Sequence, residues 1–442
     1  MSELELGALL IGSLVVMVLM GVPIAISLFT TGFGGIWLIR GDVEMALRLM
    51  YMSAYSGIDD YIFATIPLFV LMGLLVSVSN VGKDTFDVAE ALLRRVRGAL
   101  GVATVAANTV FAAVTGVSIA SAAVFTKIAV PEMARHGYLK SFAAGTVAGS
   151  SILGMMIPPS LLLIIYGVLA EQSIGKLFVA GLIPGILLAL GFVALIVLMA
   201  TFLPHKVFDM ERRKELAEAA NNTPLLTPFQ LASKLVPIGA LVVLVLGGLY
   251  SGFFTPTEAG GVGAFGALVI AILRRALNPS RMWKVLNETG GVSVGILILL
   301  VTASFYSRML SIAGVPVAIG ELIQDAGFGQ YGFLLLYVAI VLLLGMIIDS
   351  SSILLIMTPI AAPIATSLGI DLIHFGIITV IAVEIGLLTP PFGISIFTVK
   401  STLNDPSVSV ESIFGGALPF IGVMLLVLLI IAVSPELTLA LV

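Results

Sequence analysis

The chain has 442 residues, of which 59% are hydrophobic and only 10% are charged, and its mean hydropathy is +1.18. Ordinary soluble domains carry about a quarter charged residues, so this composition excludes a soluble globular protein and indicates a polytopic membrane protein. The absence of cysteine excludes disulfides and thiolate metal sites, and a formal net charge of -4 gives no indication of nucleic-acid binding.

Long apolar runs predict membrane-spanning helices, and they recur in the same order in both halves. In hydrocarbon the backbone must satisfy its own hydrogen bonds, and runs far beyond strand length favour helices over a barrel, so we predict an all-α fold. The first half has apolar runs at about 6–20, 24–40, 62–80, 139–170 and 177–203. The second half has them at about 229–251, 257–273, 291–312, 371–402 and 411–434. We expect five crossings per half.

One more segment in each half is predicted to be a re-entrant hairpin. As a single helix, residues 98–131 would reach about 51 Å, against a hydrocarbon core of about 30 Å. Polar residues from Thr115 to Ser121 lie at the middle, and basic residues flank both ends, so both ends are expected on one side. The matching hairpin is expected at about 330–363, with its tip near Asp349. Amphipathic stretches near 82–97 and 314–328 are expected to connect the hairpins to the other spans.

The second half repeats the first with an offset of 232 residues. Ser118 matches Ser350, and the double proline Pro158-Pro159 matches Pro390-Pro391. Residues of this kind decide where a backbone turns or a helix breaks, so the repeated feature is a pattern of interrupted helices. Such a duplication inside an apolar chain is typical of secondary transporters.

The basic residues predict that the two repeats are inverted. Lys and Arg accumulate in cytoplasmic loops, yet Arg135 corresponds to Ser367 and Arg274 to Asp42, so each half lacks the other's basic positions. An odd number of crossings per half gives the same orientation. We expect a first repeat at 1–203, a cytoplasmic linker at 204–228 and a second repeat at 229–442, with both termini periplasmic.

The double prolines are predicted to build binding sites. Each lies inside an apolar run of about 32 residues and removes two backbone donors, which splits the helix. Freed carbonyls and hydroxyls can coordinate Na⁺, and half-helix N-termini attract a carboxylate. The alternative is that the prolines only kink packed helices, but two equivalent double prolines facing Ser/Thr-rich hairpins favour a site.

Ionisable residues within the spans each have two readings. Asp349 can be a cation ligand or a helix cap, and Glu384 can bond to a neighbouring helix or carry a proton. Arg308 can extend to the outer interface or meet an anionic substrate. Lys127 and Lys400 are expected to extend to the cytoplasmic interface, and His374 is expected to be a packing residue.

Three strings in register resemble one family. Gly252-Phe-Phe-Thr-Pro-Thr-Glu-Ala-Gly260, Gly369-Ile-Asp-Leu-Ile-His-Phe-Gly376 and Ile385-Gly-Leu-Leu-Thr-Pro-Pro-Phe-Gly393 are similar to strings of the large membrane subunit of tripartite ATP-independent periplasmic (TRAP) transporters. The hairpin string Thr115-Gly-Val-Ser-Ile-Ala-Ser121 adds to the match, although the family often has a denser Ser/Gly run there.

The resemblance implies a function and a set of partners. Members belong to the ion-transporter superfamily, sit in the bacterial inner membrane, use a Na⁺ gradient and move substrate by an elevator motion. They work with a small four-helix membrane subunit and a periplasmic substrate-binding protein, and their substrates are mostly organic acids, with some zwitterions. The moving core is then expected at about 98–176 and 330–405, and the remaining spans form the scaffold.

The resemblance also assigns candidate site residues. The first Na⁺ site would use Thr115, Gly116, Ser118, Pro158 and Ser160. The second would use Ser350, Ser351, Ser352, Thr389, Pro390 and Gly393. Ser121, Asp349 and Arg308 are candidate substrate contacts.

Two other classes of protein remain as alternatives. A stand-alone sodium-coupled carboxylate symporter of the same superfamily would need no partner subunits. An intramembrane enzyme is more remote, because Asp349 has no evident second aspartate and His374 lies in no HExxH-type motif. We therefore expect a transporter without enzymatic activity.

Overall fold

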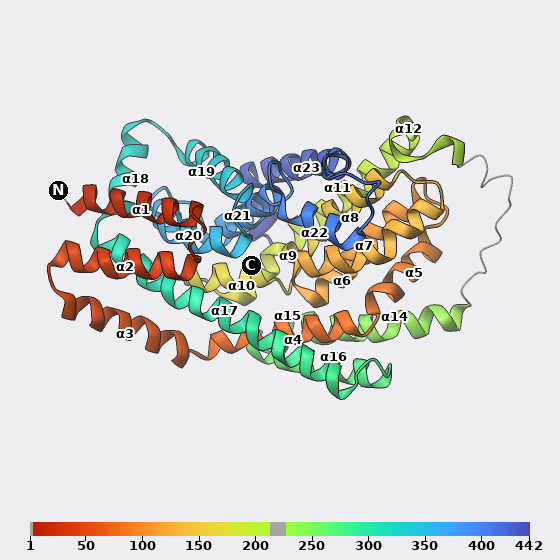
Figure 1. The fold of residues 1–442 in the computed structure, drawn as a ribbon, viewed down its shortest axis with the longest axis horizontal. Helices are drawn as coiled ribbons and strands as arrows, with labels where there is room; N and C mark the ends of the chain where they lie inside the picture. The colour runs from red at the N-terminus through yellow and green to blue at the C-terminus, as the bar shows by residue number, and fades with distance from the viewer. Residues whose placement is uncertain (1–2, 213–226) are drawn as a thin grey trace.

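The computed structural model describes residues 3–212 and 227–442, and within these ranges the chain is built from helices (Figure 1). The only β feature among the described residues is an isolated bridge between Tyr138 and Phe208. The prediction of an all-α polytopic membrane protein is confirmed. The predicted linker at 204–228 lies largely outside the described residues.

Each half runs through the same series of helices. The first half contains α1 (Glu3–Leu19), α2 (Ile24–Arg40), α3 (Val43–Asp59), η1 (Tyr61–Ala64), α4 (Thr65–Val78), α5 (Val81–Leu93), α6 (Ala99–Thr115), α7 (Ser118–Arg135), α8 (Lys140–Ser151), α9 (Leu153–Met156), α10 (Leu161–Leu169), α11 (Ile174–Phe202) and α12 (Pro204–Val207). The second contains α14 (Pro228–Val242), η2 (Val243–Gly247), α15 (Gly248–Tyr250), α16 (Pro256–Leu273), α17 (Pro279–Ile312), α18 (Val315–Asp325), α19 (Gln330–Gly345), α20 (Ser350–Ser367), α21 (Leu372–Gly386), α22 (Ile394–Leu403), α23 (Val410–Val433) and α24 (Glu436–Leu439).

The helix boundaries repeat the offset of 232 residues. The bounds of α7 and α20 differ by 232 at both ends, and so do those of α12 and α24. The predicted hairpins are helix pairs, α6 with α7 and α19 with α20, and each predicted broken run is split at its double proline. The amphipathic stretches form α5 and α18.

The sequence interpretation was wrong about one pair of equivalent segments. It began the span at 291, whereas α17 begins at Pro279, and it assigned no helix to α3. The 34 residues of α17 correspond to α3 and α4 together, which are interrupted at Asp60. Charged residues such as Arg281 and Glu288 in the first turns of α17 interrupt its apolar run, although they do not interrupt the helix.

Seven helices in the described part of the chain are long and apolar enough to cross a membrane. A bent pair, Lys140–Met156 with Leu161–Leu169, makes an eighth, and its two parts meet at 43°. Shorter apolar helices such as Ile24–Arg40 and Leu372–Gly386 occupy the other predicted runs. The ten predicted crossings thus include several that are shorter than a full bilayer span.

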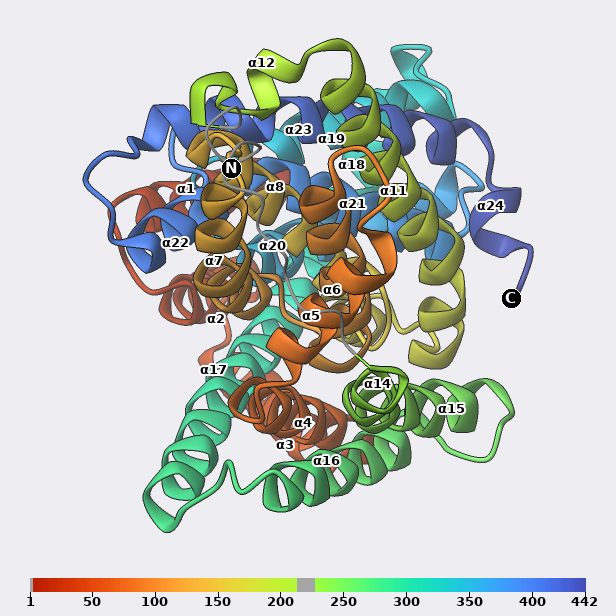
Figure 2. The same cartoon turned by 90° about the vertical axis from the view of Figure 1, so that its right-hand side faces the viewer.

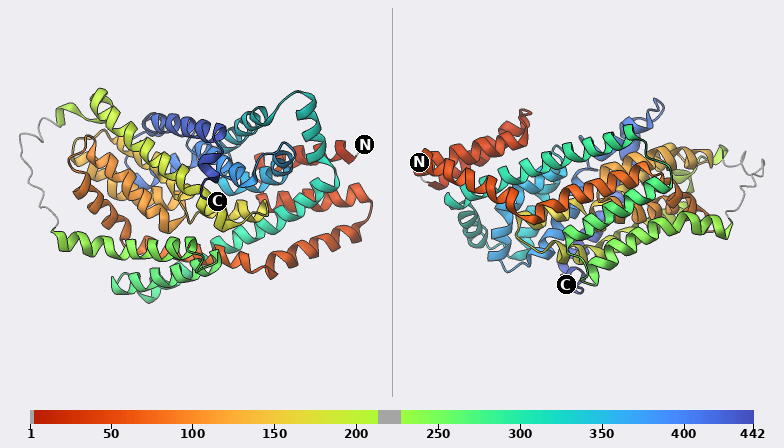
Figure 3. Two further views of the ribbon diagram at one scale, coloured as in Figure 1. Left: turned by 180° about the vertical axis from the view of Figure 1, so that it is seen from behind. Right: turned by 90° about the horizontal axis from the view of Figure 1, so that it is seen from below.

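The helices form two layers (Figures 1 and 2). One layer holds α2, α3, α4, α14, α16 and α17, and the other holds both hairpins and both broken helices; the view from behind shows the same division (Figure 3, left). Within the first layer α4 packs on α16 and α2 packs on α17. Because α2 is equivalent to α16, these two contacts exchange when the halves are exchanged, which indicates a pseudo-two-fold relation.

The long helices α11 and α23 pack in the layer of the hairpins. α11 contacts α6, α21 and α23, and α23 contacts α8 most extensively. A Cβ at Gly145 of α8 would lie 2.2 Å from the backbone carbon of Gly416 in α23. Glycines therefore let these two backbones approach closely, as at many membrane helix contacts.

Short helices join the two layers at each end. α5 packs on α6 and is tied to the other layer by ion pairs, because Lys234 of α14 and Arg274 at the end of α16 both bind Asp84, with Lys234 Nζ 3.2 Å from Asp84 Oδ1. Its counterpart α18 packs on α20, α17 and α1 through apolar contacts such as Gly7 against Val315.

Candidate functional site

The first hairpin tip lies directly on the first helix break. Gly116 ends α6 with a φ of +64°, and its carbonyl accepts a hydrogen bond of 3.2 Å from the N–H of Leu161, the first residue after the break. A Cβ at position 116 would lie 2.4 Å from the carbonyl oxygen of Pro159. The Pro158-Pro159 peptide bond is cis, and residues 157–160 are buried. The tip and the break therefore form one buried, carbonyl-rich unit.

The candidate hydroxyls of this first site differ in their partners. Thr115 donates to the carbonyl of Phe111 at 2.9 Å. The hydroxyl of Ser160 donates to the carbonyl of Met155 and accepts from the N–H of Leu163 at 3.3 Å, which caps α10. Ser118 is fully buried, and its hydroxyl has no hydrogen-bond partner among the described residues.

Ser121 belongs to a polar network inside the hairpin layer. Its hydroxyl donates to Asn108 Oδ1 at 2.6 Å, and Asn108 Nδ2 donates to Ser150 at 2.6 Å. All three side chains are fully buried. The sequence interpretation did not select Asn108 or Ser150, although an amide in an apolar helix is itself a signal of a specific buried contact.

At the second hairpin tip, Asp349 caps α20. Its carboxylate accepts hydrogen bonds from the N–H of Ser352, at 3.2 Å, and from the hydroxyl of the same residue. Asp349 is exposed, Ser350 and Ser352 are buried, and Ser351 is half-buried. Of the two roles considered for Asp349, the geometry is that of a helix cap.

The second break is more open than the first. Thr389 donates to the carbonyl of Ile385 at 2.7 Å, the Pro390-Pro391 bond is cis, and Gly393, the residue before α22, has a φ of +57°. Pro391 is exposed and Phe392 is 54% exposed. The second hairpin meets its broken helix upstream of the break, because a Cβ at Gly345 would lie 2.7 Å from Cα of Gly386.

Glu384 lies near one hydroxyl of each hairpin tip. It lies on α21, is 2% exposed, and neither carboxylate oxygen has a hydrogen-bond partner in the described structure. The nearby hydroxyls belong to Ser118 of the first tip and Ser350 of the second, which are equivalent positions of the repeat. These hydroxyls face the carboxylate, although they do not meet the geometry of a hydrogen bond to it.

Arg308 lines a cavity between the two layers. The cavity has a volume of about 640 Å³ and is bounded by η1, α17, the end of α10 and Pro359 of α20. Its charged residues are Arg308, Asp60 and Glu171, and Ser304 and Ser307 line it beside Arg308. Arg308 is half-buried.

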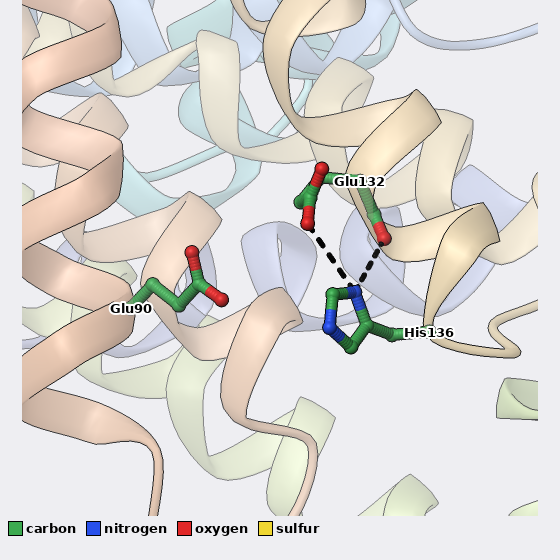
Figure 4. A group of neighbouring side chains, drawn as sticks. All are labelled: Glu90, Glu132 and His136. Carbon is green, nitrogen blue, oxygen red and sulfur yellow. Dashed lines mark hydrogen bonds and ion pairs between the residues drawn. The ribbon is translucent and has the colours of Figure 1, made fainter. Parts of the chain in front are cut away.

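A second titratable cluster joins α5 to the end of the first hairpin. Glu90 of α5 faces Glu132 and His136 of α7, and ligand atoms of all three lie within 4.8 Å of one another (Figure 4). His136 Nδ1 lies 2.9 Å from the carbonyl oxygen of Glu132 and 3.5 Å from its Oε1. Burial, and then the nearby charge of Glu132, raise the pKa of the Glu90 carboxyl above its usual range. The equivalent residues of the second half are Leu322, Ile364 and Leu368.

Two other ionisable residues have structural partners. His374 Nδ1 lies 2.8 Å from the hydroxyl of Thr438, which confirms the prediction of a packing histidine. Lys400 donates to the carbonyls of Asp405 and Val408, at 2.8 and 2.6 Å, and so closes the loop after α22.

Repeated helices, paired hairpins and helices broken at double prolines define a membrane transport permease. The family model of the tripartite ATP-independent periplasmic transporter, DctM component, matches residues 11–437. The chain therefore belongs to this family of large TRAP permease subunits, and the predicted resemblance is confirmed.

Two relatives within the family are named for different substrates. The chain is 35% identical to the C4-dicarboxylate TRAP transporter large permease protein DctM of Pseudomonas aeruginosa, over 90% of each chain. It is 30% identical to the ectoine/5-hydroxyectoine TRAP transporter large permease protein UehC of Ruegeria pomeroyi, over 97% of this chain and 96% of that one. Among solved structures, the Alcanivorax borkumensis YdaH transporter aligns with a TM-score of 0.60 at 15% identity, over 89% of this chain and 90% of that one. That likeness concerns the fold alone.

Proposed function

We propose that the chain is the permease of a sodium-coupled, binding-protein-dependent importer of a small organic acid or zwitterion. The observation that carries the proposal is the contact of the first tip with the first break. There the carbonyls of Gly116 and Pro159 and the hydroxyls of Thr115, Ser118 and Ser160 are gathered in one buried region. Neutral oxygen ligands of this kind suit Na⁺.

The second Na⁺ site would lie at the second tip and break, with Ser350, Ser351, Ser352, Thr389, Pro390 and Gly393 as candidates. The double proline Pro390-Pro391 would free the carbonyls at this break, as Pro158-Pro159 does at the first break. In this proposal Na⁺ binding orders both tips and completes the substrate site, so that coupling is a difference in affinity between tip conformations.

The transport motion would be a sliding of the hairpin layer past the layer of α2, α4, α16 and α17. The packing of α11 and α23 against α6, α8 and α21 favours including them in the moving layer, which enlarges the core expected at 98–176 and 330–405. α5 and α18 would act as the arms between the layers.

The cavity at Arg308 supports a substrate with a carboxylate. A guanidinium pairs with a carboxylate through two parallel hydrogen bonds, and Ser304 and Ser307 add donors. Asp60 and Glu171 in the same cavity disfavour a second negative charge and favour a cationic group on the substrate. Among organic acids and zwitterions, this charge pattern fits a zwitterion better. Ser121 and Asp349 are less favoured as substrate contacts, because Ser121 bonds to Asn108 and Asp349 caps α20.

The partners would be a small four-helix membrane subunit and a periplasmic substrate-binding protein, in the bacterial inner membrane with both termini periplasmic. The word tripartite in the family description supports three components. A stand-alone sodium symporter is the second candidate, and co-purification of a small membrane protein with the chain distinguishes the two.

Uptake into proteoliposomes tests the proposal. With all three components present and binding protein loaded with its ligand, an inward Na⁺ gradient should stimulate uptake strongly over a K⁺ gradient of equal ionic strength. Equal uptake in both gradients would remove the coupling, and uptake without the binding protein would favour the stand-alone symporter.

A further inference from the structure

Glu384 is a buried carboxylate that the fold leaves without a protein partner. Both of its oxygens and the hydroxyl of Ser118 are buried and unbonded within the described residues. Burying an ionised carboxylate without compensation is expensive, more so in a membrane protein, and such groups in spans usually mark a functional site. In its ionised state the group therefore requires a counter-charge that the described side chains do not supply.

The sequence repeat places Glu384 between two equivalent residues of the hairpins. Ser118 and Ser350 begin α7 and α20, and they are equivalent positions in the two halves. One side chain that faces both of them must lie near the pseudo-two-fold axis that relates the hairpins. The position equivalent to Glu384 is Ile152, which is buried and apolar, so the pair of tips shares a single carboxylate.

The chemistry of these groups selects the ligand. A carboxylate and two hydroxyls are hard oxygen ligands, which favour Na⁺ over softer ions, and none of the three groups carries a positive charge. Asp349 is not an alternative anion for this position, because it is exposed and bonded to Ser352.

We propose that Glu384, Ser118 and Ser350 form a cation site that bridges the two hairpin tips, and that shares Ser118 with the first helix-break site and Ser350 with the second. A Na⁺ held here links the first tip to the second, so neither tip releases it independently. Ordering of one hairpin tip by this ion then depends on ordering of the other tip. This inference rests on the sodium coupling proposed above.

The test uses the purified permease and the reconstituted complex. Na⁺ is titrated against choline at constant ionic strength, and the half-saturating concentration is read from the thermal midpoint and from uptake. We expect Glu384→Gln to raise the half-saturating Na⁺ concentration at least about tenfold in both readouts. An effect of this size is typical for loss of a group that supports a metal. Glu384→Asp should raise it less. Glu288→Gln, an exposed glutamate of α17, is the matched control and should leave it unchanged.

The outcomes separate the site from the proposed function. If Na⁺ stabilises the wild type and drives its uptake but Glu384→Gln titrates identically, the bridging site is wrong and the sodium coupling stands. If the wild type responds to Na⁺ in neither readout, the sodium coupling itself fails.

Serine variants keep the proposal testable if Glu384→Gln does not fold. Ser118→Ala and Ser350→Ala each remove one hydroxyl and retain the carboxylate, and each should raise the half-saturating Na⁺ concentration several-fold. Ser27→Ala, a fully buried serine of α2, is the control. Unchanged titrations in both tip variants would overturn the site.

Discussion

The two hairpin units are built from equivalent residues but close in different ways. In the first, Gly116 meets Pro159 and Leu161, so the tip covers the break and the prolines are buried. In the second, contact occurs upstream at Gly345 and Gly386, and the break is left partly exposed. The difference shows that a repeat of turn-forming residues specifies where the chain breaks, while the neighbouring side chains decide how tightly each break is covered.

Among the proposed variants, the largest loss of thermal stability and uptake is expected for Gly116→Ala. Gly116→Ala combines a left-handed backbone with a contact of 2.4 Å to a carbonyl oxygen, and such strain costs about 2–4 kcal/mol. It should lower the thermal midpoint strongly and reduce uptake at least about tenfold, since the tip can no longer seat on the break. Gly393→Ala should cost only about 1–2 kcal/mol, because its nearest neighbour is the movable ring of Phe414.

Gly422→Ala in α23 is the control for both glycine variants. A Cβ there would meet no described atom within 4 Å, so the midpoint and the uptake should stay at wild-type values. Equal losses of thermal midpoint and uptake for Gly116→Ala and Gly393→Ala would contradict the inferred difference in how the two hairpin units close.

The next effect concerns the contact upstream of each break. Gly386→Ala places a Cβ 2.6 Å from Cα of Gly345, whereas Gly154→Ala, the equivalent change in the first half, meets backbone only at 3.2 Å. Gly386→Ala should therefore lower the thermal midpoint more than Gly154→Ala. The reverse order would contradict the closer approach of the second hairpin.

Cysteine labelling measures how open each break is, and the natural chain has no cysteine. Phe392 and Ser160 are equivalent positions, one 54% exposed and the other fully buried. Phe392→Cys should react with a membrane-permeant maleimide many times faster than Ser160→Cys. Trp283→Cys, at a position that is 72% exposed, gives the reference rate. Similar rates at both breaks would mean that they are covered alike.

The smallest effect distinguishes the two arms by their pH dependence. Burial raises the pKa of Glu90, so the folded state binds this proton more tightly than the unfolded state. Its contribution to stability is present at low pH and is lost as pH rises from about 4.3 through the raised value. Glu90→Gln should flatten that part of the curve of thermal midpoint against pH. Glu321→Gln, at an exposed position of α18, is the matched control.

Much of the fold followed from the sequence because it depends on local breaks. The double prolines and the glycine at 116 determine where helices end whatever surrounds them, so the hairpins and broken helices were placed within a few residues. The helix α3 and the start of α17 were missed, because hydropathy alone does not detect the polar turns of a helix that continues past an apolar run.

The candidate site could be predicted from the sequence only in part. Motif strings select residues near breaks, but they do not show which tip meets which helix. The approach of Ser118 and Ser350 to Glu384 depends on packing between segments more than 30 residues apart or in different halves. The bonding of Ser121 to Asn108 depends on how the two helices of the first hairpin pack, although these residues are only 13 apart. The role of Glu384 in particular could not be chosen before both hairpins were placed.

The inverted relation of the halves can be measured directly at one pair of equivalent residues. Arg135 and Ser367 end the two hairpins, and both are exposed. In cells, a membrane-impermeant maleimide should label Ser367→Cys from the periplasm and reach Arg135→Cys only after the membrane is opened. Labelling of both cysteines from the same side would contradict the inverted repeats and, with them, the shared position of the two tips.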